Sequence, residues 1–346
     1  MKAIRVPRHG GPEVLEIADL PDPQPGPGEV LVAIRAAGVN HLDTWVRRGM
    51  PGIKLPLPMI PGSDGAGVIA ALGAGVTDWK TGDRVFVSPA YSCGRCEACG
   101  SAREPLCRDY GLLGEHRNGT QAELVALGAR QVLPLPEGLS FEEGAAFPLV
   151  FLTAWHMLVD RAAVRPGDDV LIQAGGSGVG TAAIQIARLH GARVLATVGS
   201  DDKAAKAKAL GADQVINYRT TDVLDAVRRA TGKRGVDIVL DSTGQETWEK
   251  SIQSLAKGGR LVTCGATTGH EAKTDLRFVF FKGLSILGST MGSRAELLRV
   301  ARFVGERRLR PIIDRVLPFE KVAEAHRALA ERAPFGKIVL TPRGAA

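Results

Sequence analysis

Four of the five cysteines lie within fifteen residues of one another. Cys93, Cys96, Cys99 and Cys107 have the spacing C-x2-C-x2-C-x7-C, and only Cys264 stands apart. Four thiolates in one loop are sufficient ligands for a tetrahedral Zn2+ site. Because sulfur would fill every coordination position, no water or substrate could bind the metal, and we predict one structural Zn2+.

Two other chemistries also fit a cysteine cluster. In a bacterial ferredoxin the fourth cysteine follows after three residues and precedes a proline, whereas the gap here is seven residues, which favours zinc over iron–sulfur. Four buried free thiols are the other alternative, and a loop rich in Gly, Arg and Glu argues against them. The clustering is unlike a secreted disulfide framework, and no apolar leader segment is visible, so we expect a cytoplasmic protein.

A second chemical motif is a glycine-rich turn. Residues 169–180, DVLIQAGGSGVG, form an apolar strand that ends in glycines, and a helix-forming segment follows. In this context Gly175 permits the tight turn, Gly178 lets the backbone approach a diphosphate, and Gly180 lets the helix pack on the strand. The predicted cofactor-binding turn consists of Gly175, Gly176, Ser177, Gly178, Val179 and Gly180. A glycine-rich turn without a ligand is the alternative.

The second strand of this segment ends without the acid that NAD sites use. Such sites place Asp or Glu about 20 residues after the turn, whereas this strand ends in Gly199 and Ser200, with Lys203 one turn into the next helix. Small residues and a cation leave space and positive charge for a 2′-phosphate, and Tyr218 and Arg219 follow the third strand nearby. We therefore favour NADP(H) over NAD(H).

Two features keep NAD(H) open. Asp201 and Asp202 are close enough to the strand end to serve a ribose. Lys203 fits equally well as a solvated helix cation. Gly265, after the fifth strand, is a further candidate for cofactor binding.

The elements that must position these motifs follow from the pattern of the chain. Six apolar strands alternate with helical segments at 169–174, 193–198, 214–217, 236–240, 260–264 and 284–287. This alternation predicts an α/β doubly wound parallel sheet with strand order 3-2-1-4-5-6. Residues 1–145 instead show short strands punctuated by Gly and Pro, which is typical of a β-rich domain.

Composition limits the classes of function. The 346 residues suggest two domains, and no apolar run is long enough to span a membrane. The net charge of +7 divides into −3 over residues 1–150, +4 over 151–290 and +6 over 291–346. With aromatic residues at only 5% and no compact basic stripe, we expect no nucleic-acid partner and a small-molecule substrate.

Taken together, PGSDGAGVIAALG (61–73), the cysteine loop and the GGSGVG turn resemble the medium-chain dehydrogenase/reductase superfamily, which contains zinc alcohol dehydrogenases and quinone reductases. The resemblance covers essentially the whole chain. It implies a GroES-like catalytic domain made of residues 1–150 and 291–346, with its zinc lobe at 93–107, and a Rossmann domain at 151–290. It also implies a homodimer or homotetramer built partly through 284–287.

The chain departs from the alcohol dehydrogenases at the catalytic zinc. Asn40, Ser63 and Leu149 stand at or near positions where those enzymes have ligands, and Asp64 follows Ser63. Asn and Ser are poor ligands for Zn2+ and Leu is none. Leu42 stands where the family has the hydroxyl that relays the alcohol proton. These departures resemble the zinc-independent quinone reductase branch, whereas the lobe resembles the alcohol dehydrogenase branch.

Without a Lewis acid, interconversion of simple alcohols and carbonyls loses its main electrophile, whereas a quinone or enone needs only a few hydrogen-bond donors for its spread charge. We hypothesise that Asn40 and Ser63 are those donors, that Asp43 and Asp64 orient them, and that Thr153 contacts the nicotinamide carboxamide. We therefore expect an NADP(H)-preferring oxidoreductase that acts on a quinone, enone or related conjugated carbonyl.

The resemblance also implies two basic contacts to the cofactor diphosphate, His41 and Lys337. Two rival functions stay open. One is an alcohol or aldehyde dehydrogenase with an unconventional catalytic metal held by some set among His41, Asp43, Asp64 and His116. The other is a non-catalytic nicotinamide-binding protein.

Overall fold

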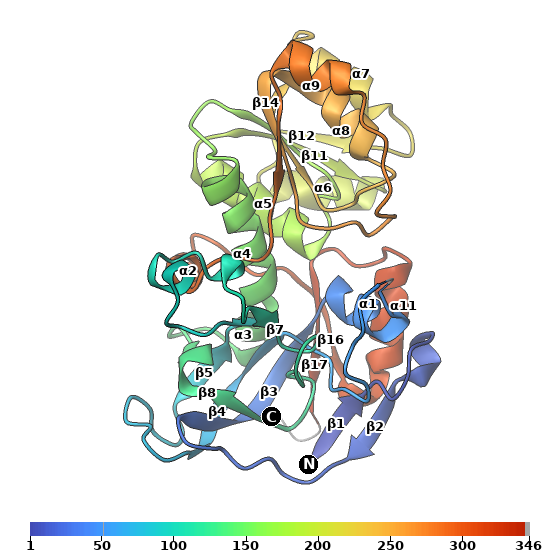
Figure 1. Ribbon diagram of the computed structural model, residues 1–346. Coiled ribbons are helices and arrows are strands. Elements are labelled where there is room, and N and C mark those ends of the chain that lie inside the picture. The colour runs from blue at the N-terminus through green and yellow to red at the C-terminus, as the bar shows by residue number, and fades with distance from the viewer. Residues whose placement is uncertain (51, 343–346) are drawn as a thin grey trace. The chain divides into compact units, whose positions relative to one another are not determined.

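The computed structural model describes residues 1–50 and 52–342, and the chain divides into two compact units (Figure 1). Unit 1 consists of Met1–Leu149, Ser293–Glu306 and Pro311–Ala346, and unit 2 consists of Val150–Gly292 and Arg307–Arg310. None of the helices in the described ranges combines the length and apolar character needed to cross a bilayer.

Unit 1 is built on a seven-stranded sheet in the order β16-β17-β3-β4-β5-β9, with β8 also paired to β3. Its strands are β3 (Glu29–Val39), β4 (Asp64–Leu72), β5 (Arg84–Val87), β8 (Leu124–Gly128), β9 (Val132–Pro134), β16 (Ile313–Pro318) and β17 (Lys337–Thr341). β17 runs antiparallel to β3, with Ile338 opposite Val39. The C-terminal segment therefore completes the sheet that the N-terminal segment begins.

Shorter elements surround this sheet. Two small ladders pair β1 (Lys2–Arg5) with β2 (Glu16–Asp19) and β6 (Ala90–Tyr91) with β7 (Gly111–Leu112). The helices of unit 1 are α1 (His41–Arg48), α2 (Glu97–Gly100), α3 (Phe141–Ala146), α10 (Arg294–Gly305) and α11 (Val322–Ala330). Helix α4 (Pro148–Trp155) begins in unit 1 and continues into unit 2.

Gly38, in β3, allows close packing of α3 and the start of β4. A Cβ at Gly38 would lie 2.3 Å from the Ala145 carbonyl oxygen and 3.0 Å from the Cβ of Asp64. Real Cβ atoms do not approach backbone this closely. Gly38 therefore lets α3 pack directly on β3 beside the start of β4.

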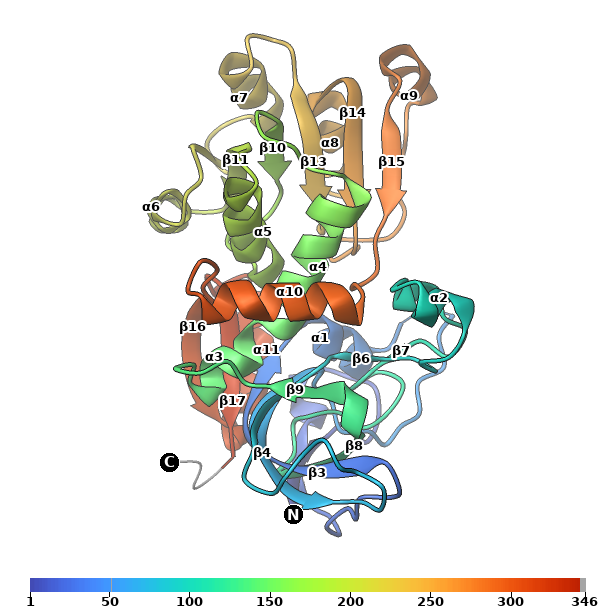
Figure 2. The same cartoon turned by 90° about the vertical axis from the view of Figure 1, so that its left-hand side faces the viewer.

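Unit 2 contains a six-stranded parallel sheet in the order β12-β11-β10-β13-β14-β15. Its strands are β10 (Asp169–Ile172), β11 (Arg193–Val198), β12 (Gln214–Asn217), β13 (Val236–Asp241), β14 (Leu255–Thr263) and β15 (Ser285–Gly288). The helices are α5 (Gly178–Leu189), α6 (Asp201–Ala209), α7 (Val223–Ala230), α8 (Trp248–Ser254) and α9 (Leu276–Lys282). The predicted doubly wound α/β fold and its strand order 3-2-1-4-5-6 are confirmed. Figure 2 shows β11, β10, β13, β14 and β15 side by side in this order.

The sheet of unit 2 follows from near-continuous apolar runs. All four residues of β10 are buried, as are five of the six in β11, because helices cover both faces of the central strands. Strand β10 ends at Ile172, two residues before the predicted end. The chain turns there because Ala174 adopts a positive φ of 53°, and its N–H donates to the side-chain hydroxyl of Thr197 on β11 instead of to a backbone carbonyl of that strand.

Candidate functional site

A buried polar cluster in unit 1 joins Asn40, Asp64 and Lys337. The Asp64 Oδ2 atom accepts hydrogen bonds from Asn40 Nδ2 at 2.9 Å and from Lys337 Nζ at 3.0 Å, and Lys337 Nζ also donates to Asn40 Oδ1. The three residues are at most 5% exposed. They converge because Asn40 follows β3, Asp64 begins β4 and Lys337 begins β17, and these three strands are neighbours in the sheet.

The rest of the Asp64 residue is also engaged. Its Oδ1 atom accepts from the Leu149 N–H at 2.8 Å, and its backbone carbonyl accepts from the Thr120 hydroxyl at 2.6 Å. A buried carboxylate is tolerated only when it is paired and hydrogen-bonded. Asp64 satisfies both conditions through Lys337, Asn40 and the Leu149 N–H.

A second carboxyl group, Asp43, holds the backbone on either side of this cluster. It accepts from the Asn40 N–H at 2.9 Å, the Gly62 N–H at 3.1 Å and Gln121 Nε2 at 3.1 Å. Burial raises the pKa of Asp43 to about 7, although the hydrogen bonds from the Asn40 and Gly62 N–H groups and the charge of Lys337 oppose the shift. Asp43 therefore fixes the start of α1 and the segment before Ser63, and it titrates near neutral pH.

The two predicted substrate donors differ in how they are engaged. The Ser63 hydroxyl is fully buried and donates to the Leu113 carbonyl at 2.7 Å. Asn40 uses one N–H of its amide for Asp64, and the other N–H of that NH2 group has no acceptor among residues 1–50 and 52–342. Asn40 therefore retains a donor that a substrate oxygen can use, whereas the Ser63 proton is already committed.

His41 lies next to this cluster as a neutral side chain. Burial lowers its pKa to about 4, and the positive charges of Lys337 and Arg332 contribute to the same shift. The family resemblance implies that His41 is a basic contact for a diphosphate. At neutral pH the imidazole is uncharged, so it can act there only as a hydrogen-bond donor.

The cysteine loop brings its four sulfur atoms together. Sγ of Cys93 lies 3.8 Å from that of Cys99 and 3.5 Å from that of Cys107, and Cys96 lies 3.6 Å from Cys99. A tetrahedron with Zn–S bonds of about 2.3 Å has sulfur–sulfur edges of about 3.8 Å. The arrangement fits a zinc ion, and all four sulfur atoms lie within 4.8 Å of one another.

The thiol of Cys93 ionises more readily than an ordinary cysteine, because its pKa is lowered. Hydrogen bonds from the backbone N–H groups of Arg95 and Cys96 lower the pKa of Cys93 to about 6, which favours its thiolate. Cys264, in unit 2, has the opposite tendency, since burial and then the charge of Asp241 raise its pKa to about 12. Cys264 therefore favours the protonated thiol, and it lies outside the cluster.

The glycine turn of unit 2 lies between β10 and α5. Ser177 caps the helix, and its hydroxyl accepts from the Gly180 N–H at 3.0 Å. A Cβ at Gly180 would lie 2.2 Å from the Ala174 carbonyl oxygen, so the helix can pack here only with glycine. The helix begins at Gly178, and Val179 lies in its first turn. Gly175 and Gly176 form the bend before it.

The predicted 2′-phosphate residues gather after β11 and β12. A Cβ at Gly199 would lie 2.5 Å from the Tyr218 hydroxyl and 3.6 Å from Arg219 Nε, so both side chains cross the end of β11. Ser200 caps α6 by accepting from the Lys203 N–H at 3.3 Å. Gly199 is small because the Tyr218 ring occupies the space above it.

The two acids that kept NAD(H) open have partners elsewhere. Asp201 accepts from Asn217 Nδ2 at 2.8 Å, and Asp202 pairs with Lys206 at 2.9 Å. The Asp201 carboxylate is therefore directed toward β12, and the Asp202 carboxylate lies along α6.

Thr153 and Gly265 are the remaining cofactor and catalytic candidates in unit 2. The Thr153 side chain is 4% exposed, and its hydroxyl lies 3.6 Å from the Met291 sulfur. The Gly265 carbonyl accepts from the Thr263 hydroxyl at 3.3 Å, just beyond β14.

The residues considered for an unconventional metal do not gather. Within the described part of the chain, no group of potential ligands combines His41, Asp43, Asp64 and His116. The His116 Nδ1 atom accepts from the Leu112 N–H at 3.2 Å, and the Asp64 carboxylate is occupied by Lys337.

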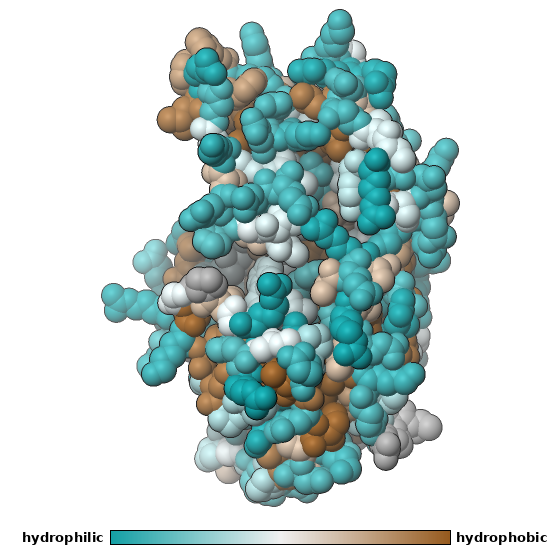
Figure 3. All heavy atoms as spheres, turned by 90° about the vertical axis from the view of Figure 1, so that its right-hand side faces the viewer, coloured by the Kyte–Doolittle hydropathy of each residue, from teal (hydrophilic) through white to brown (hydrophobic). Residues whose placement is uncertain are grey.

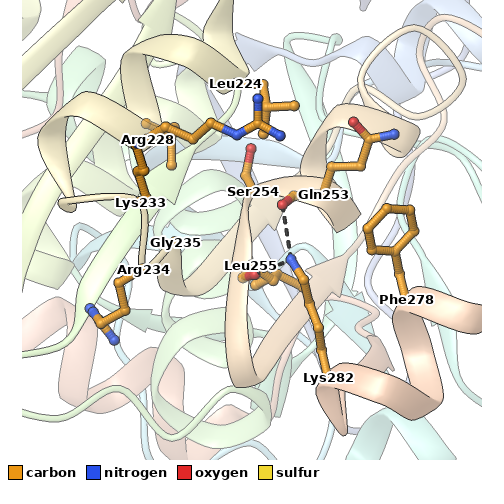
Figure 4. Close-up of a pocket in the computed structure, with 11 residues that line it drawn as sticks. Leu224, Arg228, Lys233, Arg234, Gly235, Gln253, Ser254, Leu255, Phe278 and Lys282 are labelled. Atoms are coloured by element: carbon orange, nitrogen blue, oxygen red, sulfur yellow. Dashed lines mark hydrogen bonds between the residues drawn. The ribbon is translucent and has the colours of Figure 1, made fainter.

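Unit 2 also has a pocket of about 220 Å3 at the amino ends of its strands, whereas the glycine turn lies at their carboxyl ends (Figure 4). Gly235 and Leu255, at the starts of β13 and β14, line it, whereas the glycine turn follows the carboxyl end of β10. Figure 4 shows Lys282 pointing into it, with Nζ donating to the carbonyls of Gln253 and Leu255 at 3.1 and 2.6 Å. This pocket is therefore separate from the predicted dinucleotide site.

Sequence reasoning missed the groups that complete the unit 1 cluster. Thr120 and Gln121 are fully buried and hydrogen-bond to Asp64 and Asp43, yet they lie in a loop with no recognisable pattern. The Leu149 and Leu113 contacts use backbone atoms, which leave no signal in residue type.

The chain is similar over nearly its full length to known oxidoreductases. Residues 26–137 match the family model described as "Alcohol dehydrogenase GroES-like domain", and residues 178–306 match "Zinc-binding dehydrogenase". The chain is 34% identical to a quinone oxidoreductase of Homo sapiens, covering 98% of this chain and 97% of that protein. It is 32% identical to an alcohol dehydrogenase of Schizosaccharomyces pombe, covering 96% and 95%.

A solved structure extends this similarity. It is described as an NAD-dependent alcohol dehydrogenase, and it shares 54% identity with this chain over 99% of both chains, with a TM-score of 0.95.

Proposed function

The chain belongs to the medium-chain dehydrogenase/reductase superfamily of NAD(P)-dependent oxidoreductases, and from this premise we propose that it transfers a hydride to a quinone, enone or related conjugated carbonyl without a catalytic zinc. The observation that carries the proposal is the Asn40–Asp64–Lys337 cluster. Where the alcohol dehydrogenases of the family hold a second metal, this chain has a buried ion pair and an amide.

The cluster suits a conjugated acceptor. The bound cofactor supplies the hydride, and negative charge then develops on the oxygen of the acceptor. Because that charge is spread over an enolate or phenolate, oriented hydrogen-bond donors are sufficient to stabilise it. The remaining amide N–H of Asn40 is the donor we assign, with Asp64 holding the amide and Asp43 holding its backbone.

Lys337 has a positioning role in this proposal. Its ammonium donates to Asn40 and to Asp64, which leaves one of its three N–H groups for the diphosphate contact that we expect. Ser63 orients the 61–64 segment through its bond to Leu113 and is not a direct donor in the conformation observed. Thr153 remains our candidate for the nicotinamide carboxamide, and His41 for a neutral contact to the diphosphate.

We propose that Cys93, Cys96, Cys99 and Cys107 hold one zinc ion and that this zinc is structural, which the clustering of their sulfur atoms supports. Four sulfur ligands leave no open coordination position. The ion would fix the loop that carries α2 (Glu97–Gly100). All five cysteines are free of disulfides among the described residues, and we propose a cytoplasmic location, where thiols stay reduced.

We propose a preference for NADP(H). The 2′-phosphate would lie near Ser200, Lys203 and Tyr218, with Arg219 beside Gly199. The engagement of Asp201 and Asp202 with other side chains supports this preference, since neither carboxylate is directed at a ribose.

We propose that two or more copies assemble through the β15 edge of unit 2. β15 pairs only with β14 among the described strands, and Ile286 on it is 39% exposed. On the adjacent helix α9, Leu276, Phe280 and Phe281 are between 64% and 73% exposed. Figure 3 shows hydrophobic side chains gathered at the part of unit 2 that carries α9. A second copy of the chain would cover this apolar surface and the open strand edge.

The second candidate function is an alcohol dehydrogenase, because a solved structure at 54% identity is described in those terms. Steady-state assays separate the two functions. NADPH oxidation with a quinone and with an enone, and NAD(P)+ reduction with short alcohols, are measured on the same enzyme. Our proposal is supported if the turnover rates with the quinone and the enone are much higher than those with the alcohols. The reverse ranking favours the second candidate, and cofactor binding without turnover of any of them would leave a binding protein.

A further inference from the structure

Unit 2 contains a chain of buried side-chain hydrogen bonds that none of the chemistry above uses. The Thr197 hydroxyl donates to Gln173 Oε1 at 2.8 Å, Gln173 Nε2 donates to the Ser251 hydroxyl at 3.1 Å, and Ser251 donates to Asp241 Oδ2 at 2.8 Å. All four residues are at most 2% exposed. They lie on β11, beyond β10, on α8 and at the end of β13, so the chain crosses three neighbouring strands.

At one end of this hydrogen-bond chain, Thr197 holds the start of the glycine turn. The Thr197 hydroxyl accepts from the Ala174 N–H at 3.1 Å, and the Thr197 carbonyl accepts from the Gly175 N–H at 2.7 Å. Ala174 has a positive φ of 53°, a conformation that costs free energy for any residue other than glycine. Thr197 therefore secures the backbone that sets the direction of the turn.

The other end of this hydrogen-bond chain is the buried carboxylate of Asp241. Asp241 Oδ1 accepts from the N–H groups of Thr243 and Gly244 at 2.8 and 3.1 Å, and the Thr247 hydroxyl lies 2.7 Å from Oδ2. Among the described residues no cation pairs with Asp241, so hydrogen bonds alone compensate its charge. Asp241 thereby fixes the segment that follows β13.

Every donor in the chain points the same way. The Ala174 N–H, the Thr197 hydroxyl, the Gln173 amide and the Ser251 hydroxyl each donate toward Asp241. Hydrogen bonds in such a chain polarise one another, and a buried carboxylate at its end strengthens the effect. The glycine turn and the 243–247 segment both lie at the carboxyl edge of the sheet, where ligands of doubly wound sheets bind.

We propose that Thr197, Gln173 and Ser251 are positioning residues for the dinucleotide, because they tie the glycine turn to the buried Asp241 carboxylate. The chain holds the turn in its binding conformation before the cofactor arrives, so the cofactor does not have to order it. This proposal rests on NAD(P) binding alone and is independent of the substrate.

The test uses a pair of variants at one position. Thr197→Val keeps the shape of the side chain and removes the hydroxyl, whereas Thr197→Ser keeps the hydroxyl and removes a methyl group. Dissociation constants for NADPH and NADH are measured by fluorescence titration of the full-length protein without substrate, at a temperature where circular dichroism shows each variant folded. We expect Thr197→Val to raise both constants roughly tenfold and Thr197→Ser to change them less than about threefold.

A second pair of variants tests the distant end of the chain. Ser251→Ala removes a link, whereas Ser254→Ala, on the same helix, removes a buried hydroxyl that donates only to the Lys250 carbonyl of its own helix. We expect Ser251→Ala to raise the dissociation constants for both nucleotides and Ser254→Ala to leave them unchanged. This difference should persist even if the two variants lose the same amount of thermal stability. This pair also keeps the test valid if Thr197→Val does not fold.

Equal dissociation constants for Ser251→Ala and Ser254→Ala would overturn the proposal, as would equal constants for the two Thr197 variants. A double variant, Thr197→Val with Ser251→Ala, should weaken binding by less than the product of the single effects, because both break the same chain. Failure of the quinone proposal would leave these binding constants unaffected, so the two proposals fail independently.

Discussion

The Lys337 ammonium lies 3.0 Å from the Asp64 carboxylate, and both side chains are buried. Lys337 belongs to the C-terminal strand and Asp64 to the start of β4, and Asn40 is bonded to both. The pair places a buried positive charge beside the Asn40 amide. Because each charge compensates the other, the stability of the protein should depend on the presence of both, and unfolding experiments can measure this dependence.

Removing Lys337 should destabilise the protein more than removing the whole pair. Lys337→Met leaves Asp64 buried and uncompensated, which costs about 3–5 kcal/mol in comparable pairs. In the double variant Lys337→Met with Asp64→Asn no buried charge remains, and most of this stability should return. Urea unfolding gives the two values. A single variant as stable as the wild type would show that the pair does not hold the cluster together.

Replacing Asn40 should affect the rate of hydride transfer more than stability. Asn40→Ala removes the donor assigned to the substrate oxygen, and loss of one such donor lowers kcat by about 100-fold. Because Asn40 also starts α1, the matched control is Ser140→Ala, which removes the capping residue of α3. We expect stopped-flow or steady-state rates with a quinone to fall only for Asn40→Ala. An unchanged kcat would remove Asn40 from the mechanism.

The pKa of Asp43 predicts a dependence of stability on pH. Its folded-state value of about 7 is above its ordinary value, so the folded protein binds the proton more tightly than the unfolded chain. The resulting stabilisation is full below about pH 4 and is lost as the pH rises to about 7, at up to about 1.4 kcal/mol per pH unit.

His41 opposes this effect, because its lowered pKa makes stability fall as the pH drops from about 6.5 to about 4. The contribution of Asp43 is therefore measured as the difference between the wild type and Asp43→Asn in urea unfolding from pH 5 to pH 8. The wild type should lose stability relative to the variant as the pH rises. Parallel curves would mean that Asp43 titrates outside this range.

The residues beyond β11 predict the choice of coenzyme. Lys203→Ala and Arg219→Ala should each weaken NADPH binding several-fold and leave NADH binding nearly unchanged, because only NADPH carries the 2′-phosphate. Lys206→Ala is the control, since that lysine lies on the same helix and pairs with Asp202. Titrations with both nucleotides test this assignment. Equal effects on NADPH and NADH would place these cations away from the phosphate.

Much of the fold could be predicted because unit 2 carries a strong pattern. Strands buried on both faces read as apolar runs, and each is followed by a helix, so their order followed from the general rule for doubly wound sheets. β16 was not predicted, because Ile313–Pro318 contains charged residues and lies at the edge of its sheet, half exposed. An edge strand lacks the burial that creates an apolar pattern.

The candidate site could be predicted only in part. The sequence identified Asn40, Asp64 and Lys337 separately, but Lys337 lies 297 residues after Asn40, and only the pairing of β17 with β3 brings them together. The contact of Lys337 with the cofactor diphosphate stays a prediction, and the bonds of its ammonium to Asp64 and Asn40 could not be predicted. Such long-range contacts depend on strand register, which no local pattern specifies.

The proposed function requires that the enzyme work with one structural zinc and no catalytic metal. Metal analysis of purified, active protein tests it most directly, with Cys96→Ser expected to lose the zinc and Cys264→Ser expected to keep it. We predict one zinc per chain together with full turnover of a quinone by NADPH. Two zinc ions per chain, with activity that disappears when the second is removed, would contradict the account.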